Sequence, residues 1–269
     1  MTARERFPRP SVMGVLNVTP DSFSDGGMFL DPAAALVQAE QMIGEGAAVI
    51  DVGGESTRPG SEPVDAGEEL GRVMPVVEGL AARGAPISID TSKAEVARRA
   101  LEVGAVLVND VSALRGDPDM AETVAASRAD VCLVHMQGTP KTMQNEPCYG
   151  DVVSEVKAFL EERLSFAVGQ GISEDRVWLD PGIGFGKRLE HNLEILRRLD
   201  EIVAIGRPIV IGASRKRFLG ALTGRAERDR VAATVAANVL AFERGAWMFR
   251  VHDVAQTRDA LTVAGATVT

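Results

Sequence analysis

The chain of 269 residues contains little cysteine and little histidine, two of the first and three of the second. Cys132 lies inside an apolar run and Cys148 in a loop-like stretch, so the two do not suggest a disulfide framework. Reduced thiols in a cytoplasmic protein are the simpler interpretation. Three histidines scattered along the chain do not form a zinc site.

Long hydrophobic runs and an excess of positive charge are also missing. No apolar run approaches the roughly 18 residues that indicate a membrane span. Residues 1–10 carry charges without the apolar core of a signal peptide. The 29 Lys and Arg stand against 38 Asp and Glu, and the net charge of −9 argues against nonspecific nucleic-acid binding. Binding of an anionic small-molecule substrate stays possible, because such binding needs only a local cluster of positive groups.

What the chain does have is a series of eight apolar, strand-like runs, most of them separated by helix-like segments that stop at a glycine. The runs cover residues 12–17, 48–55, 86–90, 106–110, 131–135, 177–180, 208–216 and 248–253. This alternation, in a chain near the roughly 250 residues of one barrel, predicts a single α/β domain with the TIM (β/α)8 barrel fold. A doubly wound open sheet is the alternative. We expect residues 1–11 to be an N-terminal lead-in and residues 12–269 to form the barrel.

Polar side chains stand at the downstream end of these runs, where a parallel barrel has its active site. Asp90, Asn109 and Asp180 are short groups that could together bind a polar heterocycle at the barrel mouth. Asp51, Asp90, Asp110 and Asp180 lie in or beside apolar runs, and a carboxylate in such a place is costly unless it is paired or used. For any single one of these aspartates, a structural hydrogen bond to a loop explains its position equally well.

A second group of polar residues follows the first, second and eighth runs, which are neighbours in a closed barrel. Its members are Asn17, Thr57, Arg58, Arg250 and His252. Arginine binds phosphate through paired hydrogen bonds, and a neutral amide such as that of Asn17 offers Mg²⁺ a hard oxygen ligand. The group therefore predicts an anion site with magnesium.

Residues 214–217, Ser-Arg-Lys-Arg, put three positive charges at an expected helix start, where they oppose the helix dipole. This local conflict favours a role in holding an anion or an electron-rich ring over the alternative of a solvated basic corner. The glycine-rich stretch 182–187 lacks the spacing of a nucleotide-binding loop, and a tight turn that lets the backbone approach a ligand fits it better. We expect His135 and His191 to be structural.

Taken in order, these segments make the sequence resemble the dihydropteroate synthase family from Val12 to about Leu261. The blocks that carry the resemblance are residues 13–27, 51–60, 88–91, 108–111, 135–140, 179–187, 212–216 and 250–254. The resemblance implies a transferase of folate biosynthesis that joins 6-hydroxymethyl-7,8-dihydropterin diphosphate to p-aminobenzoate, giving 7,8-dihydropteroate and diphosphate. It also implies Mg²⁺, a barrel fold, a homodimer and competition by sulfonamides at the p-aminobenzoate site.

Residue by residue, the resemblance assigns three neighbouring subsites. The pterin pocket would be formed by Asp90, Asn109, Asp180 and Lys216, with Arg250 stacked on the ring. The diphosphate site would be formed by Asn17, Arg250 and His252, with Asn17 on Mg²⁺. The p-aminobenzoate pocket would be bordered by Phe23, Thr57, Arg58, Pro59, Phe185 and Lys216, and the two loops at residues 19–29 and 57–60 would close over it.

The chemistry of these residues suits the reaction. Diphosphate leaves readily once Mg²⁺, Arg250 and His252 neutralise its charge, and Asp90 can stabilise the cationic pterin methylene that remains. Lys216 completes the expected catalytic set. The residues alone do not separate this order of steps from direct displacement by the amine.

One position departs from the family pattern. Many members carry a serine after Ser-Arg-Lys that meets the p-aminobenzoate carboxylate, and this chain has Arg217 there. We expect the carboxylate to be bound by Arg217 or by a backbone N–H at the helix start, with Ser214 nearby. Two other functions are compatible with a pterin barrel, namely presentation of methyl-folate to a corrinoid protein and a silent paralogue that binds pterin without turnover. The first function would not need the full set of anion-binding residues that this chain has, and the intact motifs argue against the second.

Overall fold

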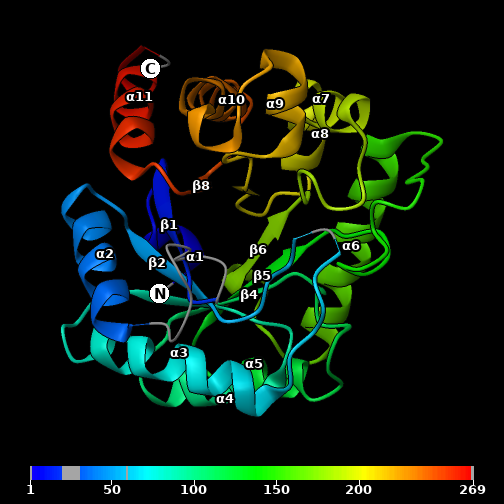
Figure 1. The fold of residues 1–269 in the computed structure, drawn as a ribbon. Coiled ribbons are helices and arrows are strands. Elements are labelled where there is room, and N and C mark those ends of the chain that lie inside the picture. The colour runs from blue at the N-terminus through cyan, green and yellow to red at the C-terminus, as the bar shows by residue number, and fades with distance from the viewer. Residues whose placement is uncertain (1, 20–30, 59, 268–269) are drawn as a thin grey trace.

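The computed structural model describes residues 2–19, 31–58 and 60–267. Eight parallel strands form one sheet, and most of its strands pair with their neighbours in the sequence (Figure 1). The strands are β1 (Ser11–Asn17), β2 (Val49–Gly53), β3 (Ile87–Asp90), β4 (Leu107–Asp110), β5 (Asp130–Val134), β6 (Val177–Asp180), β7 (Val210–Ile211) and β8 (Met248–Val251).

The sheet closes on itself into a barrel. Strands follow the order β6-β5-β4-β3-β2-β1-β8-β7. The two ends of this order meet through a parallel bridge between Leu179 and Ile209, where the Leu179 N–H donates to the Pro208 carbonyl at 3.1 Å. Closure confirms the (β/α)8 barrel over the doubly wound open sheet.

Helices surround the barrel, as expected for parallel strands that need a crossover between each pair. The α-helices of the described residues are α1 (Ala3–Arg6), α2 (Pro32–Gly44), α3 (Ala66–Ala81), α4 (Ala94–Glu102), α5 (Met120–Ala126), α6 (Val152–Gly169), α7 (Leu189–Arg197), α8 (Leu199–Val203), α9 (Arg217–Thr223), α10 (Val231–Glu243) and α11 (Val254–Thr267). Local signals set many of the ends. Asp31 caps α2 by accepting from the Ala33 N–H, and Pro32 takes the first helical position.

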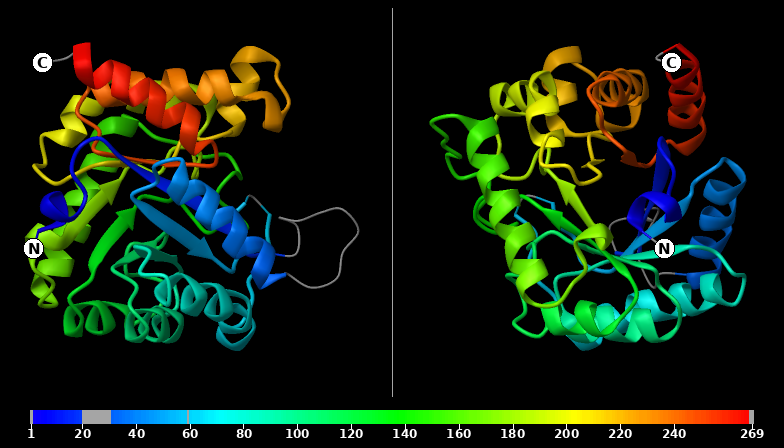
Figure 2. Two further views of the ribbon diagram at one scale, coloured as in Figure 1. Left: turned by 90° about the vertical axis from the view of Figure 1, so that its left-hand side faces the viewer. Right: turned by 180° about the vertical axis from the view of Figure 1, so that it is seen from behind.

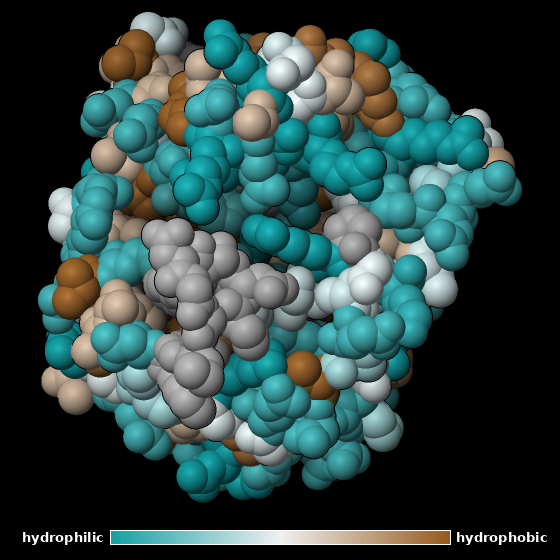
Figure 3. All heavy atoms as spheres, in the orientation of Figure 1, coloured by the Kyte–Doolittle hydropathy of each residue, from teal (hydrophilic) through white to brown (hydrophobic). Residues whose placement is uncertain are grey.

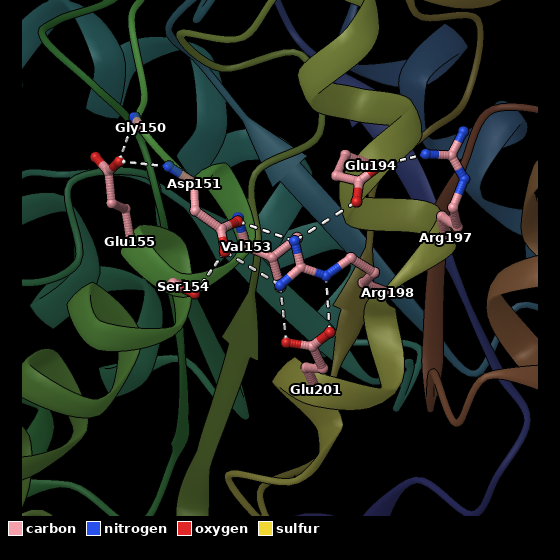
Figure 4. A network of polar contacts seen from close by, with 9 residues as sticks. All are labelled: Gly150, Asp151, Val153, Ser154, Glu155, Glu194, Arg197, Arg198 and Glu201. Atoms are coloured by element: carbon pink, nitrogen blue, oxygen red, sulfur yellow. Dashed lines mark hydrogen bonds and ion pairs between the residues drawn. The ribbon is translucent and has the colours of Figure 1, made fainter.

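The helical segment between β6 and β7 is divided at Arg198 into α7 and α8. Figure 4 shows the contacts at this point: the Arg198 guanidinium donates to Asp151, the N-cap of α6, and to Glu201. These bonds join the start of α6 to the turn between α7 and α8. A contact with a residue 47 positions away leaves no trace in local periodicity.

Residues 2–10 close the amino-terminal end of the barrel. Phe7 is buried and its ring lies 6.0 Å from that of Trp178, while the Trp247 indole donates to the Phe7 carbonyl at 2.7 Å. In the left view of Figure 2, α1 lies at the end from which the strand arrows point away. The expected lead-in therefore contributes to the barrel floor.

The inside of the barrel changes character along its axis. Side chains alternate along each strand between the barrel interior and the surrounding helices. Towards the floor the interior is filled by Met13, Val49, Leu107, Trp178 and Met248, all fully or almost fully buried. Two residues further along four of the same strands stand Asp51, Asn109, Asp180 and Arg250. The apolar plug thus ends where the polar layer of the barrel mouth begins.

Candidate active site

A pocket lies at the carboxyl ends of the strands. Figure 3 looks onto this end, and hydrophilic residues surround its centre. The pocket is lined by Thr57, Asp90, Asn109, Val111, Val134, Asp180, Phe185, Gly212, Lys216 and Arg250. Seven of these were predicted from the sequence, and the structure brings them together from six different strands and the loops that follow them.

Arg250 is the central cation of the pocket. Its Nε donates to Asp51 Oδ2 and its Nη2 to Asp90 Oδ2, each at 2.6 Å. Burial alone would lower the pKa of Arg250, but the carboxylates of Asp51 and Asp90 outweigh it and raise the pKa above its ordinary value. The guanidinium is therefore a permanent charge whose plane is fixed from two sides.

Asp90, the last residue of β3, has a carboxyl group that titrates near neutrality. Burial raises its pKa to about 7, against the pull of Arg250, and the charge of Asp51 adds to the rise. Gly53 pairs with Asp90 across the strands, and a Cβ there would come within 3.3 Å of the Asp90 Cβ. The glycine makes room for the carboxyl group at this point of the sheet.

Asp180 ends β6 on the opposite side of the pocket. Its Oδ1 accepts from the Gly182 N–H at 2.6 Å, and burial raises its pKa to about 6 although the charge of Lys216 opposes the rise. Gly182 has a φ of +67°, and a Cβ at this position would stand 1.8 Å from the His135 carbonyl oxygen. Only glycine fits this turn, which directs a backbone donor at Asp180.

Lys216 and Phe185 form one wall. The Lys216 Nζ lies 4.0 Å from the centre of the Phe185 ring, which is close enough for a cation–π contact. Burial, together with the charge of Arg250, lowers the pKa of Lys216 to about 8. The side chain thus retains its proton at neutral pH while it is held against an aromatic surface.

Ser214 and His252 form a hydrogen-bonded pair beside this wall. Ser214 Oγ lies 2.9 Å from His252 Nδ1 and accepts from the His252 backbone N–H at 3.2 Å. Burial, reinforced by Arg215 and Arg250, lowers the pKa of His252 to about 3, so the imidazole is neutral. With Ser214 as donor to Nδ1, the ring proton stands on Nε2, which becomes a hydrogen-bond donor.

The run of three basic residues after Ser214 divides between different environments. Arg215 adopts a φ of +56° and its guanidinium pairs with Asp253 at 2.5 and 3.0 Å, while Arg230 donates to the Arg215 carbonyl. Lys216 lines the pocket, and Arg217 is exposed at the first position of α9. The expected basic cluster therefore supplies one pocket cation, one structural ion pair and one exposed cation.

Of the remaining predicted residues, the structure describes Asn17 and Arg58. Asn17 ends β1, in register with Gly53 of β2. Arg58 is 67% exposed in its side chain and lies 3.3 Å from Glu227. Phe23 and Pro59 lie outside the described residues.

Asn17 can be tested as a magnesium ligand from the chemistry around it. Within residues 2–19, 31–58 and 60–267, no three His, Cys, Asp or Glu side chains are placed to hold a metal ion together. An all-protein cage is therefore missing from the described part of the chain. Magnesium commonly keeps several waters and binds through one or two protein oxygens plus substrate phosphates, so a single amide oxygen at the mouth fits this ion.

Two of the polar residues weighed in the sequence are structural. Asp110 turns away from the pocket and accepts from the backbone N–H groups of Ser112 and Leu114, both at 2.7 Å. His135 is buried with its Nδ1 2.8 Å from Lys187 Nζ, which also donates to the Gly182 and Phe185 carbonyls. These bonds hold the loop after β6 in place.

The sequence argument did not single out the apolar lining of the pocket or the residue behind Arg250. Val111, Val134 and Gly212 also line the pocket and add surface without charge to it. Asp51 was noted only as one of several aspartates near apolar strands, and it proves to be the partner of Arg250. The position of Asp51 in the middle of a strand that ends at the barrel mouth was the sequence feature that could have indicated this pairing.

Fold and pocket together define a class of protein: a (β/α)8-barrel enzyme whose mouth presents hydrogen-bond acceptors for a flat polar ring next to cations for an anionic group. Residues 13–252 match the family of pterin binding enzymes. The dihydropteroate synthase of Haemophilus influenzae is 46% identical over 96% of this chain and 94% of its own.

Solved structures agree with the family match. The Yersinia pestis dihydropteroate synthase in complex with a sulfonamide drug superimposes with a TM-score of 0.92 at 45% identity, covering 96% of this chain and 94% of that one. The Xanthomonas albilineans enzyme with 4-aminobenzoic acid gives 0.91 at 49% identity, covering 97% and 93%. The chain therefore belongs to the pterin-binding enzymes and, among them, to the dihydropteroate synthase family.

Proposed function

We propose that this protein condenses 6-hydroxymethyl-7,8-dihydropterin diphosphate with p-aminobenzoate to 7,8-dihydropteroate and diphosphate. The observation that carries this proposal is one pocket in which Asp90 and Asp180 face the cations Arg250 and Lys216. Relatives named for this activity match nearly the whole chain. A methyl-folate carrier barrel would have no use for the cations and polar donors that surround the mouth.

The pterin ring lies, in this proposal, between the two acidic residues. Asp180 accepts from the amino-pyrimidinone edge, because its Oδ2 is available while Oδ1 is occupied by the Gly182 N–H. Asn109 offers a further polar contact, and the guanidinium face of Arg250 stacks on the ring. Lys216 donates to an acceptor of the ring from the opposite wall.

The diphosphate is bound next to the ring, toward Asn17, Arg250 and His252. Asn17 would contribute one oxygen to Mg²⁺, which supplies charge neutralisation of the leaving diphosphate when bound. Arg250 is a permanent cation, and neutral His252 donates from Nε2. Together these groups stabilise the charge that develops as the C–O bond to diphosphate breaks.

Departure of diphosphate leaves positive charge on the pterin methylene, and Asp90 stabilises it electrostatically. A carboxyl group with a pKa of about 7 is ionised in a substantial fraction at neutral pH. The amine nitrogen of p-aminobenzoate then attacks the methylene carbon and loses a proton. Loop closure over the mouth would exclude water that otherwise traps the cation.

p-Aminobenzoate is proposed to enter beside Phe185, Lys216 and Thr57, with Phe23, Arg58 and Pro59 along the same side. We expect Arg217 or the backbone N–H groups that open α9 to bind its carboxylate. Related enzymes have been solved with these two kinds of ligand, the Xanthomonas albilineans enzyme with 4-aminobenzoic acid and the Yersinia pestis enzyme with a sulfonamide drug. We expect sulfonamides to compete with p-aminobenzoate here as well.

The protein is proposed to act as a homodimer. Leu222 of α9 and Leu240 of α10 are large apolar side chains, 55% and 47% exposed, on the last helices of the barrel order. A second copy that covers them would remove both from water. Sedimentation of the purified protein against a Leu240→Glu variant tests this: a dimer that dissociates in the variant supports the surface, and a dimer unaffected by the change places it elsewhere.

We place the reaction in the cytoplasm. In the part of the chain that the structure describes, no helix is long and apolar enough to cross a membrane. Cys132 and Cys148 are both free, and Cys132 is buried. Free thiols suit a reducing compartment.

The experiment for the proposed function is product analysis. Purified protein, the dihydropterin diphosphate, p-aminobenzoate and Mg²⁺ should yield dihydropteroate, and chelation of the metal by EDTA should suppress the yield. Formation of product at the same rate after chelation would remove Mg²⁺ from the proposal. Absence of product with intact pterin binding would favour a silent paralogue.

A further inference from the structure

Asp51 is a buried charge that the proposed reaction does not use directly. It lies in the middle of β2, is fully buried and does not line the pocket. Its Oδ2 accepts two hydrogen bonds, from Arg250 Nε at 2.6 Å and from Asn109 Nδ2 at 3.0 Å. A buried carboxylate is costly to desolvate, and such an ion pair adds little net stability compared with apolar residues of similar size.

We propose that Asp51 is a positioning residue that gives the pterin pocket its hydrogen-bond polarity and fixes the guanidinium plane of Arg250. This inference rests on the proposed function and names the part of the site that selects the ring. The residue acts through its two partners and touches no substrate.

The first effect concerns Asn109. An ionised carboxylate only accepts hydrogen bonds, so the atom of the Asn109 amide that faces Asp51 must be the nitrogen. The amide oxygen is then the atom left for the pocket that Asn109 lines. Together with Asp180, this gives the ring-binding surface two acceptors, which suits a heterocycle whose edge carries N–H donors.

The second effect concerns Arg250. Asp51 holds Nε while Asp90 holds Nη2, so two edges of the guanidinium are fixed from two different strands. A guanidinium that is held in one plane is already oriented for a flat ring to stack on it. With Asp51 neutral, Arg250 would keep a single carboxylate partner and could turn toward Asp90, which would change both stacking and the charge at the diphosphate.

The test compares two buried aspartates of the same barrel. Asp51→Asn is the test variant. Asp130→Asn is the matched control, because Asp130 is also fully buried and paired, with Trp178 Nε1 at 3.2 Å and Arg6 at 3.4 Å, but begins β5 at the barrel floor. Each change removes one buried charge at constant size.

We expect kcat/KM for the pterin diphosphate to fall on the order of 100-fold in Asp51→Asn, since two charge-assisted contacts lose their anchor. The KM for p-aminobenzoate should stay within about threefold of the unmodified protein. Asp130→Asn should lower the melting temperature and leave both kinetic constants unchanged. If Asp51→Asn behaves like the control, with a loss of stability alone, Asp51 is structural and the inference is wrong.

The pH dependence of kcat/KM is a second measurement, and a purely structural role of Asp51 would leave it unchanged. The charged groups that act on Asp90 are Asp51, Glu69, Asp110, Lys216 and Arg250. The Asp51 carboxylate raises the pKa of Asp90, so its removal should shift the acid limb of kcat/KM to lower pH. An unmoved limb in an active Asp51→Asn variant contradicts the arrangement.

If Asp51→Asn does not fold, hydrogen exchange in the unmodified protein tests whether the Arg250 side chain is held in place. With ¹⁵N-labelled arginine, one side-chain Nε–H signal that is missing in Arg250→Lys should be protected from exchange and remain so when the pterin diphosphate binds. Rapid exchange of that signal would overturn the inference. Lack of turnover in the unmodified protein would instead count against the proposed function, and the exchange measurement would still decide the role of Asp51.

Discussion

The Asp180→Ala substitution should strongly weaken pterin binding. Asp180 is buried, one oxygen is held by the Gly182 N–H at 2.6 Å, and the other is left for the ring. A hydrogen bond to a charged group contributes about 1.5–3 kcal/mol, so two contacts from the amino-pyrimidinone edge contribute about 3–6 kcal/mol. At about 1.4 kcal/mol for each factor of ten, the affinity should fall roughly 10²- to 10⁴-fold.

The measurement is a calorimetric titration of the pterin diphosphate into each protein, with thermal unfolding to verify the fold. Asp180→Asn is the informative companion. Its amide oxygen can still accept from Gly182, but its nitrogen then presents a donor to the donors of the ring. The Asn variant should therefore bind as poorly as the Ala variant, although its shape is native.

The pKa of Asp180 adds a pH dependence. Burial raises this pKa to about 6, so protonation below pH 6 removes the acceptor and the affinity of the unmodified protein should fall there. Asp90, with a pKa of about 7, titrates in the same window, so the difference between the unmodified protein and Asp180→Asn isolates Asp180. Near-native affinity in the Ala variant, or a matching pH dependence in the Asn variant, would refute the role of Asp180.

Three further predictions concern turnover. Lys216→Ala should lower kcat roughly tenfold or more at unchanged melting temperature, because a cation at the reacting end is lost; unchanged kinetics would remove Lys216 from the site. Arg217→Ser should change the apparent affinity for p-aminobenzoate more than that for the pterin, and equal or absent changes would contradict a role for Arg217 at the carboxylate. Asn17→Ala should raise the Mg²⁺ concentration needed for half-maximal rate, and an unaltered metal dependence would place the ion elsewhere.

Much of the architecture could be predicted because it depends on local sequence patterns. Apolar runs, glycine stops and polar strand ends gave eight strands, and the parallel barrel brings the ends of its strands together. Asp90, Asn109, Asp180 and Arg250 could be expected at one mouth for that reason alone. The pocket that they line confirms their proximity; their individual roles stay predictions.

Features that depend on distant partners could not be predicted in this way. Asp51 and Arg250 are 199 residues apart, so nothing in either neighbourhood shows that they pair. The bonds from Arg198 to Asp151 join residues 47 apart, and Phe7 is buried against Trp178 on the floor of the barrel. Local sequence fixes the type of an element, whereas long-range partners decide where it ends and which way its side chains turn.

The most direct test of the account is diphosphate release by the purified protein with Mg²⁺ and the dihydropterin diphosphate, measured with and without p-aminobenzoate. The account predicts release that depends on p-aminobenzoate and is matched by dihydropteroate formation. Tight pterin binding without any release in the presence of both substrates would contradict it.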